Sequence, residues 1–128
     1  MAVKYTVVSR VNPQDPQGPK KYYPRVKSIN KVGTREVADR ISGMSTLSSI
    51  DVFASTEGFL DTVSNLLADG CIVKLGDFGT FSLRIHSVGS DDPKDVSARN
   101  ITRTMVTFRP SKRFRKILDG IEFEEFQE

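Results

Sequence analysis

The spacing of apolar residues changes near residue 70, and this change limits the folds that the chain can adopt. Between residues 49 and 69 the apolar side chains recur every three or four positions, which is typical of an amphipathic helix. From Cys71 onward, large apolar residues alternate with small or polar ones, which predicts strands with one buried face. The centre of the fold is therefore predicted to be a long helix followed directly by a β-hairpin.

A shorter helical pattern precedes the long one. The apolar residues that share its spacing are Val37, Ala38, Ile41 and Met44. Thr34 stands at its start, where its hydroxyl is expected to cap the free amides. Ser48 with Asp51 three residues on predicts a cap for the second helix, and Gly70 predicts its end. Two amphipathic helices with a short polar link predict a helical hairpin with a broad apolar face.

The β-hairpin is predicted from the letters VKLGDFGTFSLR, with its turn at Gly76-Asp77. Asp77, Phe78 and Gly79 form the tripeptide Asp-Phe-Gly, which holds a magnesium ion in protein kinases. This chain, however, has no glycine-rich phosphate loop, strand lysine or catalytic loop of the kinase type. We therefore interpret Phe78 and Phe81 as core residues that anchor the hairpin, with base stacking as the alternative role.

Further strands are predicted on either side of this centre. Residues 3–11 and 22–29 are rich in β-branched and aromatic residues and are joined by a proline-rich loop. Pro24 favours an edge position for the second of them, because proline cannot donate to a neighbouring strand. Residues 86–100 are polar and predict a projecting ribbon or a flexible loop, and residues 101–108 predict another strand.

A short basic helix is predicted near the end of the chain. Pro110 fits its first turn. The apolar side chains that can face the core are Phe114, Ile117 and Leu118. Ile121 and Phe123 alternate with other residues before the acidic tail, and this pattern allows a short closing strand.

The net charge of +3 conceals four blocks of alternating sign. Residues 1–40 carry nine Lys or Arg against three acids, and residues 84–116 also carry nine against three. Residues 41–83 carry one against five, and residues 117–128 carry none against five. The alternation indicates either a surface for a polyanion with an opposite face turned away from it, or simply solvated faces.

The remaining composition argues against an enzyme or a metalloprotein. Cys71 is the single cysteine and is expected to pack as a small apolar residue, and His86 is the single histidine. No nucleophile–base pair or carboxylate pair stands at usable spacing. We therefore expect no catalytic residue, no metal, no cofactor and no small-molecule substrate. No apolar run approaches the ~20 residues that cross a bilayer, and the first residues lack the apolar core of a signal peptide. We therefore expect a cytoplasmic protein with no membrane partner.

Three segments carry a more specific signal: FLDTVSNLLADG at residues 59–70, VKLGDFGTFSLR at residues 73–84 and FRPSKRFRKIL at residues 108–118. In this order and spacing they resemble the HU/integration host factor family of bacterial histone-like DNA-binding proteins. The YYP motif near the N terminus and the acidic tail are similar to the longer HU-related proteins of the Bacteroidetes. The resemblance then covers nearly the whole chain.

The resemblance implies an α+β fold, in which a helical hairpin packs on a small antiparallel sheet with a projecting β-arm and a short C-terminal helix. The implied fold also has added N-terminal strands. It also implies an intertwined homodimer whose arms bind the minor groove of double-stranded DNA. We expect one domain over residues 1–128, with an N-terminal β extension at 1–32, an HU-like core at 33–118 and an acidic tail at 119–128. Such a protein would associate with the nucleoid in the cytoplasm.

The arm and the flanking helix supply the residues that the resemblance assigns to DNA. They are Arg84, Lys94, Arg99, Arg103, Arg109, Lys112, Arg113, Arg115 and Lys116. Each cation placed against a phosphate releases condensed counterions, so binding is expected to depend on salt and to tolerate many sequences.

The arm tip departs from the family pattern. Family arms typically end in Arg-Asn-Pro, whose proline wedges between base pairs, whereas residues 91–95 here read DDPKD. Three acids in five residues repel phosphate, so Pro93 is either a DNA wedge or a turn proline in a mobile loop. The alternative function is therefore a protein-interaction or structural module that keeps the fold but has lost DNA bending.

Overall fold

The computed structural model describes residues 2–127 and has an α+β fold with two three-stranded sheets. The chain divides into two compact units, Met1–Val32 with Ile117–Glu128 and Gly33–Lys116. The first unit contains strands β1 (Val3–Arg10), β2 (Lys21–Val26) and β6 (Phe123–Glu125). The elements of the second unit are α1 (Thr34–Gly43), α2 (Ser49–Ala68), β3 (Val73–Leu75), β4 (Gly79–Ser87) and β5 (Ile101–Pro110). Helix α3 (Lys112–Asp119) runs from the second unit into the first. The predicted fold class is confirmed, whereas the dimer stays a prediction.

The helical hairpin formed by α1 and α2 begins and ends largely as the sequence predicts. The Asp51 N–H donates to Ser48 Oγ at 3.2 Å, which caps α2. Gly70 adopts a φ of +86°, a left-handed conformation that ends the helix. The predicted cap at Thr34 is wrong. The chain is still extended at Gly33, which takes the N-cap position without a side-chain bond, so Thr34 is already helical.

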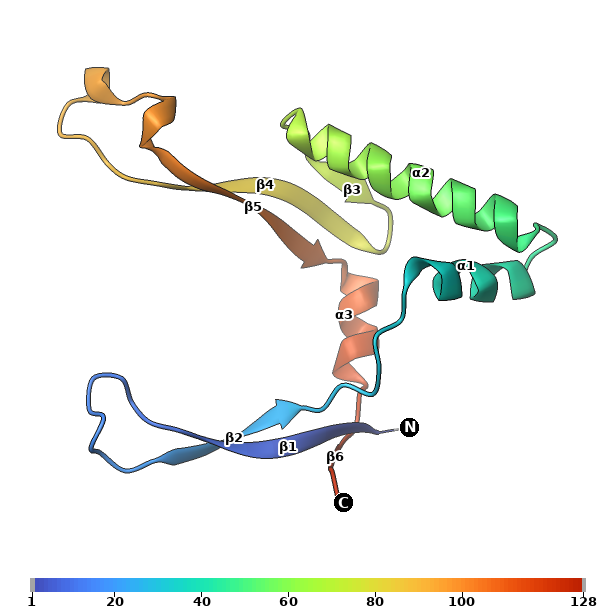
Figure 1. The fold of residues 1–128 in the computed structure, drawn as a ribbon, viewed down its shortest axis with the longest axis horizontal. Helices are drawn as coiled ribbons and strands as arrows, with labels where there is room; N and C mark the ends of the chain where they lie inside the picture. The colour runs from blue at the N-terminus through green and yellow to red at the C-terminus, as the bar shows by residue number, and fades with distance from the viewer. Residues whose placement is uncertain (1, 128) are drawn as a thin grey trace. The chain divides into compact units, whose positions relative to one another are not determined.

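The sheet of the second unit has the order β3-β4-β5, with both pairs antiparallel. Gly76 has a φ of +49° in the turn between β3 and β4. Helix α2 lies beside β3 and β4 (Figure 1). Strands β4 and β5 form a two-stranded ribbon that begins beside β3 and continues beyond it, and we call this whole ribbon the arm (Figure 1).

The entry into α3 differs from the prediction. Pro110 is the last residue of β5, opposite Gly79, and not part of the helix. Strand pairing extends this far because a proline at a strand end needs no N–H partner. Phe114 is half-buried, but Ile117 and Leu118 are exposed, and Cys71 is also exposed rather than packed.

The sheet of the first unit has the order β2-β1-β6. Strand β2 is antiparallel to β1 and lies at the edge, which confirms the interpretation of Pro24. Strand β6 is the predicted closing strand and pairs in parallel with β1, and the Phe126 N–H donates to the Tyr5 carbonyl at 2.8 Å. Within residues 2–127, none of the helices combines the length and the apolar character that crossing a bilayer requires.

Candidate nucleic-acid interface

The root of the arm is fixed by a close approach between β4 and β5. A Cβ atom added at Gly79 would lie 2.5 Å from the Phe108 ring and 2.6 Å from the Arg109 carbonyl oxygen. Only glycine therefore fits at this position, and it lets β5 pack directly against the start of β4. The tripeptide that resembles a kinase magnesium motif thus includes a glycine with a packing role. Residues 2–127 hold no group of three or more His, Cys, Asp or Glu that could bind a metal ion.

Four phenylalanines pack together at this root. The Phe81 and Phe108 ring centroids are 4.7 Å apart, and Phe78 lies 5.1 Å from Phe108 and 5.3 Å from Phe114. These tilted and edge-on contacts join both strands of the arm to α3. Phe78 and Phe81 are therefore packing residues, as predicted, although Phe78 remains 48% exposed.

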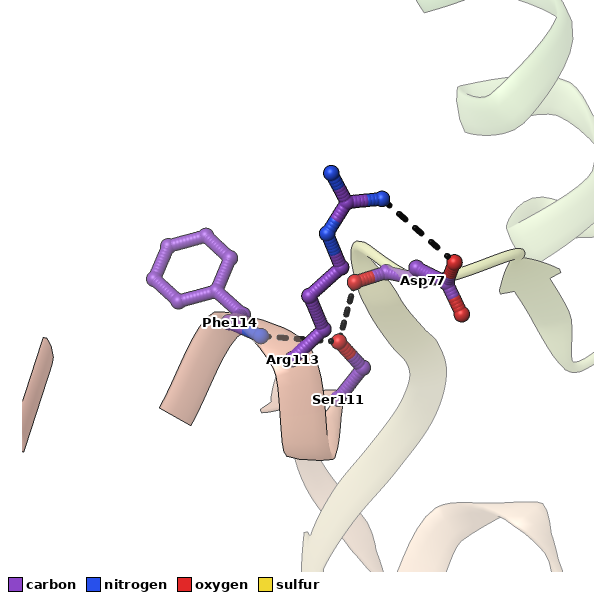
Figure 2. A network of polar contacts seen from close by, with 4 residues as sticks. All are labelled: Asp77, Ser111, Arg113 and Phe114. Carbon is purple, nitrogen blue, oxygen red and sulfur yellow. Dashed lines mark hydrogen bonds and ion pairs between the residues drawn. The ribbon is translucent and has the colours of Figure 1, made fainter. Parts of the chain in front are cut away.

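A polar network joins the start of α3 to the β3–β4 turn (Figure 2). Ser111 Oγ donates to the Asp77 carbonyl and accepts from the Phe114 N–H at 3.2 Å. Arg113 Nη1 lies 3.6 Å from Asp77 Oδ2 (Figure 2). The carboxylate of Asp77 therefore pairs with a predicted DNA-binding cation, a contact that the sequence did not predict. Its only signal in the sequence was an acid in the hairpin turn.

The register of the arm separates its two faces. Arg84 lies opposite Met105, and His86 lies opposite Arg103. Thr80 lies opposite Arg109. Because alternate residues of a strand point to opposite faces, these side chains share one face. We call Arg84, Arg103 and Arg109 the arm cationic face, and His86 lies among them. The pairs Phe81–Phe108 and Leu83–Val106 occupy the other, apolar face.

The arm tip is a structured loop. The Asn100 side-chain amide donates to the Val88 carbonyl at 2.8 Å and to Ser90 Oγ at 2.9 Å, and its oxygen accepts from the Ser97 N–H at 2.9 Å. Two 3-10 turns, Pro93–Asp95 and Ala98–Asn100, form the rest of the loop. Ordered hydrogen bonding thus replaces the flexible loop that the sequence left open.

The predicted site residues fall into three groups. The arm cationic face holds three of them. Lys94 and Arg99 lie in the 3-10 turns of the tip, beside Asp91, Asp92 and Asp95. The cations of the flank lie in α3 and are all exposed: Lys112, Arg113, Arg115 and Lys116. Pro93 opens the first 3-10 turn and is exposed, and its role as a DNA wedge stays a prediction.

This arrangement of a basic arm on a helical hairpin has clear relatives. A family model described as "HU domain fused to wHTH, Ig, or Glycine-rich motif" matches residues 1–125. The chain belongs to the HU/integration host factor family of DNA-binding proteins. Integration host factor subunit alpha of Paramagnetospirillum magneticum is 35% identical over 99 residues, which cover 74% of this chain and 90% of that protein. The subunit alpha of Actinobacillus succinogenes is also 35% identical, over 62% of this chain and 84% of that protein.

Two solved structures share the HU-like fold. The Anabaena HU–DNA cocrystal structure gives a TM-score of 0.56 at 20% identity, covering 70% of this chain and 99% of that one. A putative bacterial DNA-binding protein from Bacteroides vulgatus gives a TM-score of 0.67 at 12% identity, covering 98% of this chain. The present chain spans about half of that longer protein, 48%. The resemblance read from the sequence is confirmed.

Proposed function

We propose that this HU-family chain binds double-stranded DNA in the nucleoid with little sequence preference, through the arm cationic face and the exposed cations of α3. The observation that carries the proposal is the shared face of Arg84, Arg103 and Arg109, which the β4–β5 register places along one side of a ribbon. Guanidinium groups bind phosphate oxygens in a bidentate manner and also enter narrow minor grooves. A row of them therefore reads charge and groove shape rather than base sequence.

We propose further that the protein acts as a homodimer. The buried apolar side chains among the described residues are only Ala38, Val52, Leu67 and Val73, which is a small core for a chain of this length. A hollow of about 670 Å³ opens between α2 and the apolar side of the sheet, lined among others by Phe59, Val63 and Phe81. A second copy of the chain would cover this apolar surface and give each subunit the core that it lacks.

The arm tip argues against strong bending of the DNA. The tip carries three acids against Lys94 and Arg99, so phosphate is repelled where a family wedge would insert. Pro93 is exposed. It can insert between base pairs only if another contact offsets this repulsion. The acidic tip therefore favours, as a second candidate, a protein-interaction or structural module that keeps the fold but has lost DNA bending.

Titration of an end-labelled duplex tests the proposal directly. We expect affinity to fall steeply with salt, and energy transfer between the two labelled ends to report any bend. Replacing Lys112, Arg113, Arg115 and Lys116 together by alanine should weaken binding equally for all duplex sequences. Binding that is insensitive to salt, or a quadruple variant that binds like the wild type, would contradict the proposed DNA interface. Tight binding with unchanged energy transfer would contradict bending alone.

A further inference from the structure

The sheet of the first unit also has two chemically different faces. The β1–β2 register places Thr6 opposite Arg25, and Arg10 opposite Lys21. These residues share one face because strand side chains alternate. Lys4 lies two residues before Thr6 and Lys27 two residues after Arg25, so both point to the same face. There, Lys4 Nζ is 2.9 Å from Glu124 Oε2, and Lys27 Nζ is 3.9 Å from the centre of the Phe126 ring. The residues that we call the N-terminal cationic face are Lys4, Arg10, Lys21, Arg25 and Lys27.

The opposite face of this sheet is apolar. Tyr5, Pro24, Val26 and Phe123 line a hollow of about 310 Å³ there, which confirms independently that they point to the same side. The four cations within the three strands, together with Lys27 directly after β2, therefore gather on one surface. A random placement of solvated lysines and arginines would use both faces.

The five cations differ in what engages them. The C-terminal segment neutralises or covers Lys4 and Lys27, through Glu124 and Phe126. Arg10, Lys21 and Arg25 are exposed and take part in none of the ion pairs formed within residues 2–127.

Arg10 and Lys21 lie directly opposite each other on neighbouring strands, where like charges destabilise the pairing. An anion bound across the pair would remove this cost. A hollow of about 490 Å³ beside them is lined by both cations, Tyr23 and two prolines, Pro13 and Pro19.

We propose that the end of the N-terminal cationic face formed by Arg10, Lys21 and Arg25 is a second contact surface for the phosphate backbone of duplex DNA. The proposal rests on the proposed function, because duplex DNA is the polyanion that this chain is already inferred to hold. Arginine forks bind phosphate oxygens in pairs, and the Tyr23 hydroxyl is a further donor of the kind that contacts phosphates. Lys21 and Arg25 are about 13 Å apart along one strand, enough to reach several phosphates.

A lipid surface fits this face less well. Membrane-bound surfaces place large apolar side chains beside the cations, so that they enter the acyl region. Here the large apolar side chains lie on the opposite face, with Phe123 60% and Tyr22 70% exposed. The apolar side chains among its charges are Val8, Tyr23 and the Phe126 ring, which Lys27 covers.

Lysine acetylation of the full chain, read by mass spectrometry with and without a short duplex, tests the proposal. We expect DNA to protect Lys21 severalfold, as it should protect Lys112 and Lys116 if the arm and flank bind. Protection of Lys112 and Lys116 without Lys21 overturns the second surface and leaves the proposed function standing. Protection of Lys21 alone supports the second surface and removes the proposed flank. Protection of Lys21 by phosphatidylserine vesicles but not by duplex overturns DNA as the occupant.

A triple variant tests the same surface quantitatively. Arg10→Gln, Lys21→Gln and Arg25→Gln combined should make the slope of log affinity against log salt shallower by about 2 to 3, and lower affinity about tenfold or more at about 0.1 M salt. The charge-conserving variant Arg10→Lys with Arg25→Lys should keep the wild-type slope. An unchanged slope in a folded triple variant contradicts the proposal, and if the variant does not fold, the acetylation of the wild type still decides.

Discussion

The arm and the N-terminal sheet have similarly divided faces but differ in the packing beneath them. Each contains an antiparallel strand pair, β4–β5 or β1–β2, with cations on one face and apolar side chains on the other. The apolar face of the arm has four phenylalanines packed at its root, whereas the N-terminal sheet leaves Val7 and Tyr22 on its apolar face exposed. Strand alternation alone therefore makes a cationic face, but the packing beneath that face decides how firmly it is held.

The largest expected difference between the two ribbons is in stability. Phe108→Ala removes a ring from the centre of the phenylalanine cluster and should lower the free energy of unfolding by about 3 kcal/mol. Tyr22→Ala, on the exposed apolar face of β2, should cost less than about 1 kcal/mol. Urea unfolding followed by circular dichroism at fixed protein concentration measures both. Equal losses would mean that the two ribbons are supported alike.

One glycine in each region should also respond differently to substitution by alanine. Gly79→Ala places a methyl group against the Phe108 ring and the Arg109 carbonyl, neither of which can move aside, and should cost about 2 kcal/mol. Gly18→Ala would meet first the Asp15 carboxylate, 2.5 Å away, which can rotate into solvent. We expect the second change to stay within about 0.5 kcal/mol in the same urea experiment. A neutral Gly79→Ala would show that β4 and β5 are not closely packed in solution.

Breaking the hydrogen bonds between the hairpin turn and α3 should lower stability less than the two changes above. Ser111→Ala removes the acceptor for the Phe114 N–H and the donor to the Asp77 carbonyl, at an expected cost of about 1 kcal/mol. Ser9→Ala, at an exposed position of β1, is the control and should be nearly neutral. If both serines behave alike, the network in Figure 2 does not hold the helix.

The ion pair between Arg113 and Asp77 should have the least influence on stability. Arg113 and Asp77 are 75% and 78% exposed, so their pair contributes only about 0.3 kcal/mol to stability. Asp77→Asn should nevertheless raise DNA affinity about twofold at low salt, because it releases Arg113 and removes a charge that repels phosphate. Glu36→Gln removes one acid from an ion pair with Arg40 on α1, outside both ribbons, and should leave affinity almost unchanged. An equal rise in both variants would mean that only net charge matters.

Local signals in the sequence predicted most of the second unit. Ser48 with Asp51, the glycine at residue 70 and the change of apolar spacing were sufficient to place α2 and the hairpin, because caps and periodicity act over a few residues. Thr34 and Pro110 were misassigned by one or two positions. For Pro110 the deciding interaction is the pairing with Gly79, which lies far away in the sequence.

The sequence predicted the cations of the candidate site but not which of them share a face. The face shared by Arg84 and Arg103 depends on the register of β4 and β5 across the tip loop, and a shift of one residue would place them on opposite sides. The N-terminal cationic face was hidden for the same reason. It also depends on the parallel pairing of β6 with β1, which no local pattern near Phe123 reveals.

The assignment of the arm cationic face to DNA is tested by the salt dependence of duplex binding in the triple variant Arg84→Gln, Arg103→Gln and Arg109→Gln. These side chains are on one face and outside the phenylalanine cluster, so the fold measured by circular dichroism should be preserved. We predict a slope of log affinity against log salt that is shallower than that of the wild type by about 2 to 3. A folded arm variant with the wild-type slope and affinity would contradict the assignment of the arm cationic face to DNA.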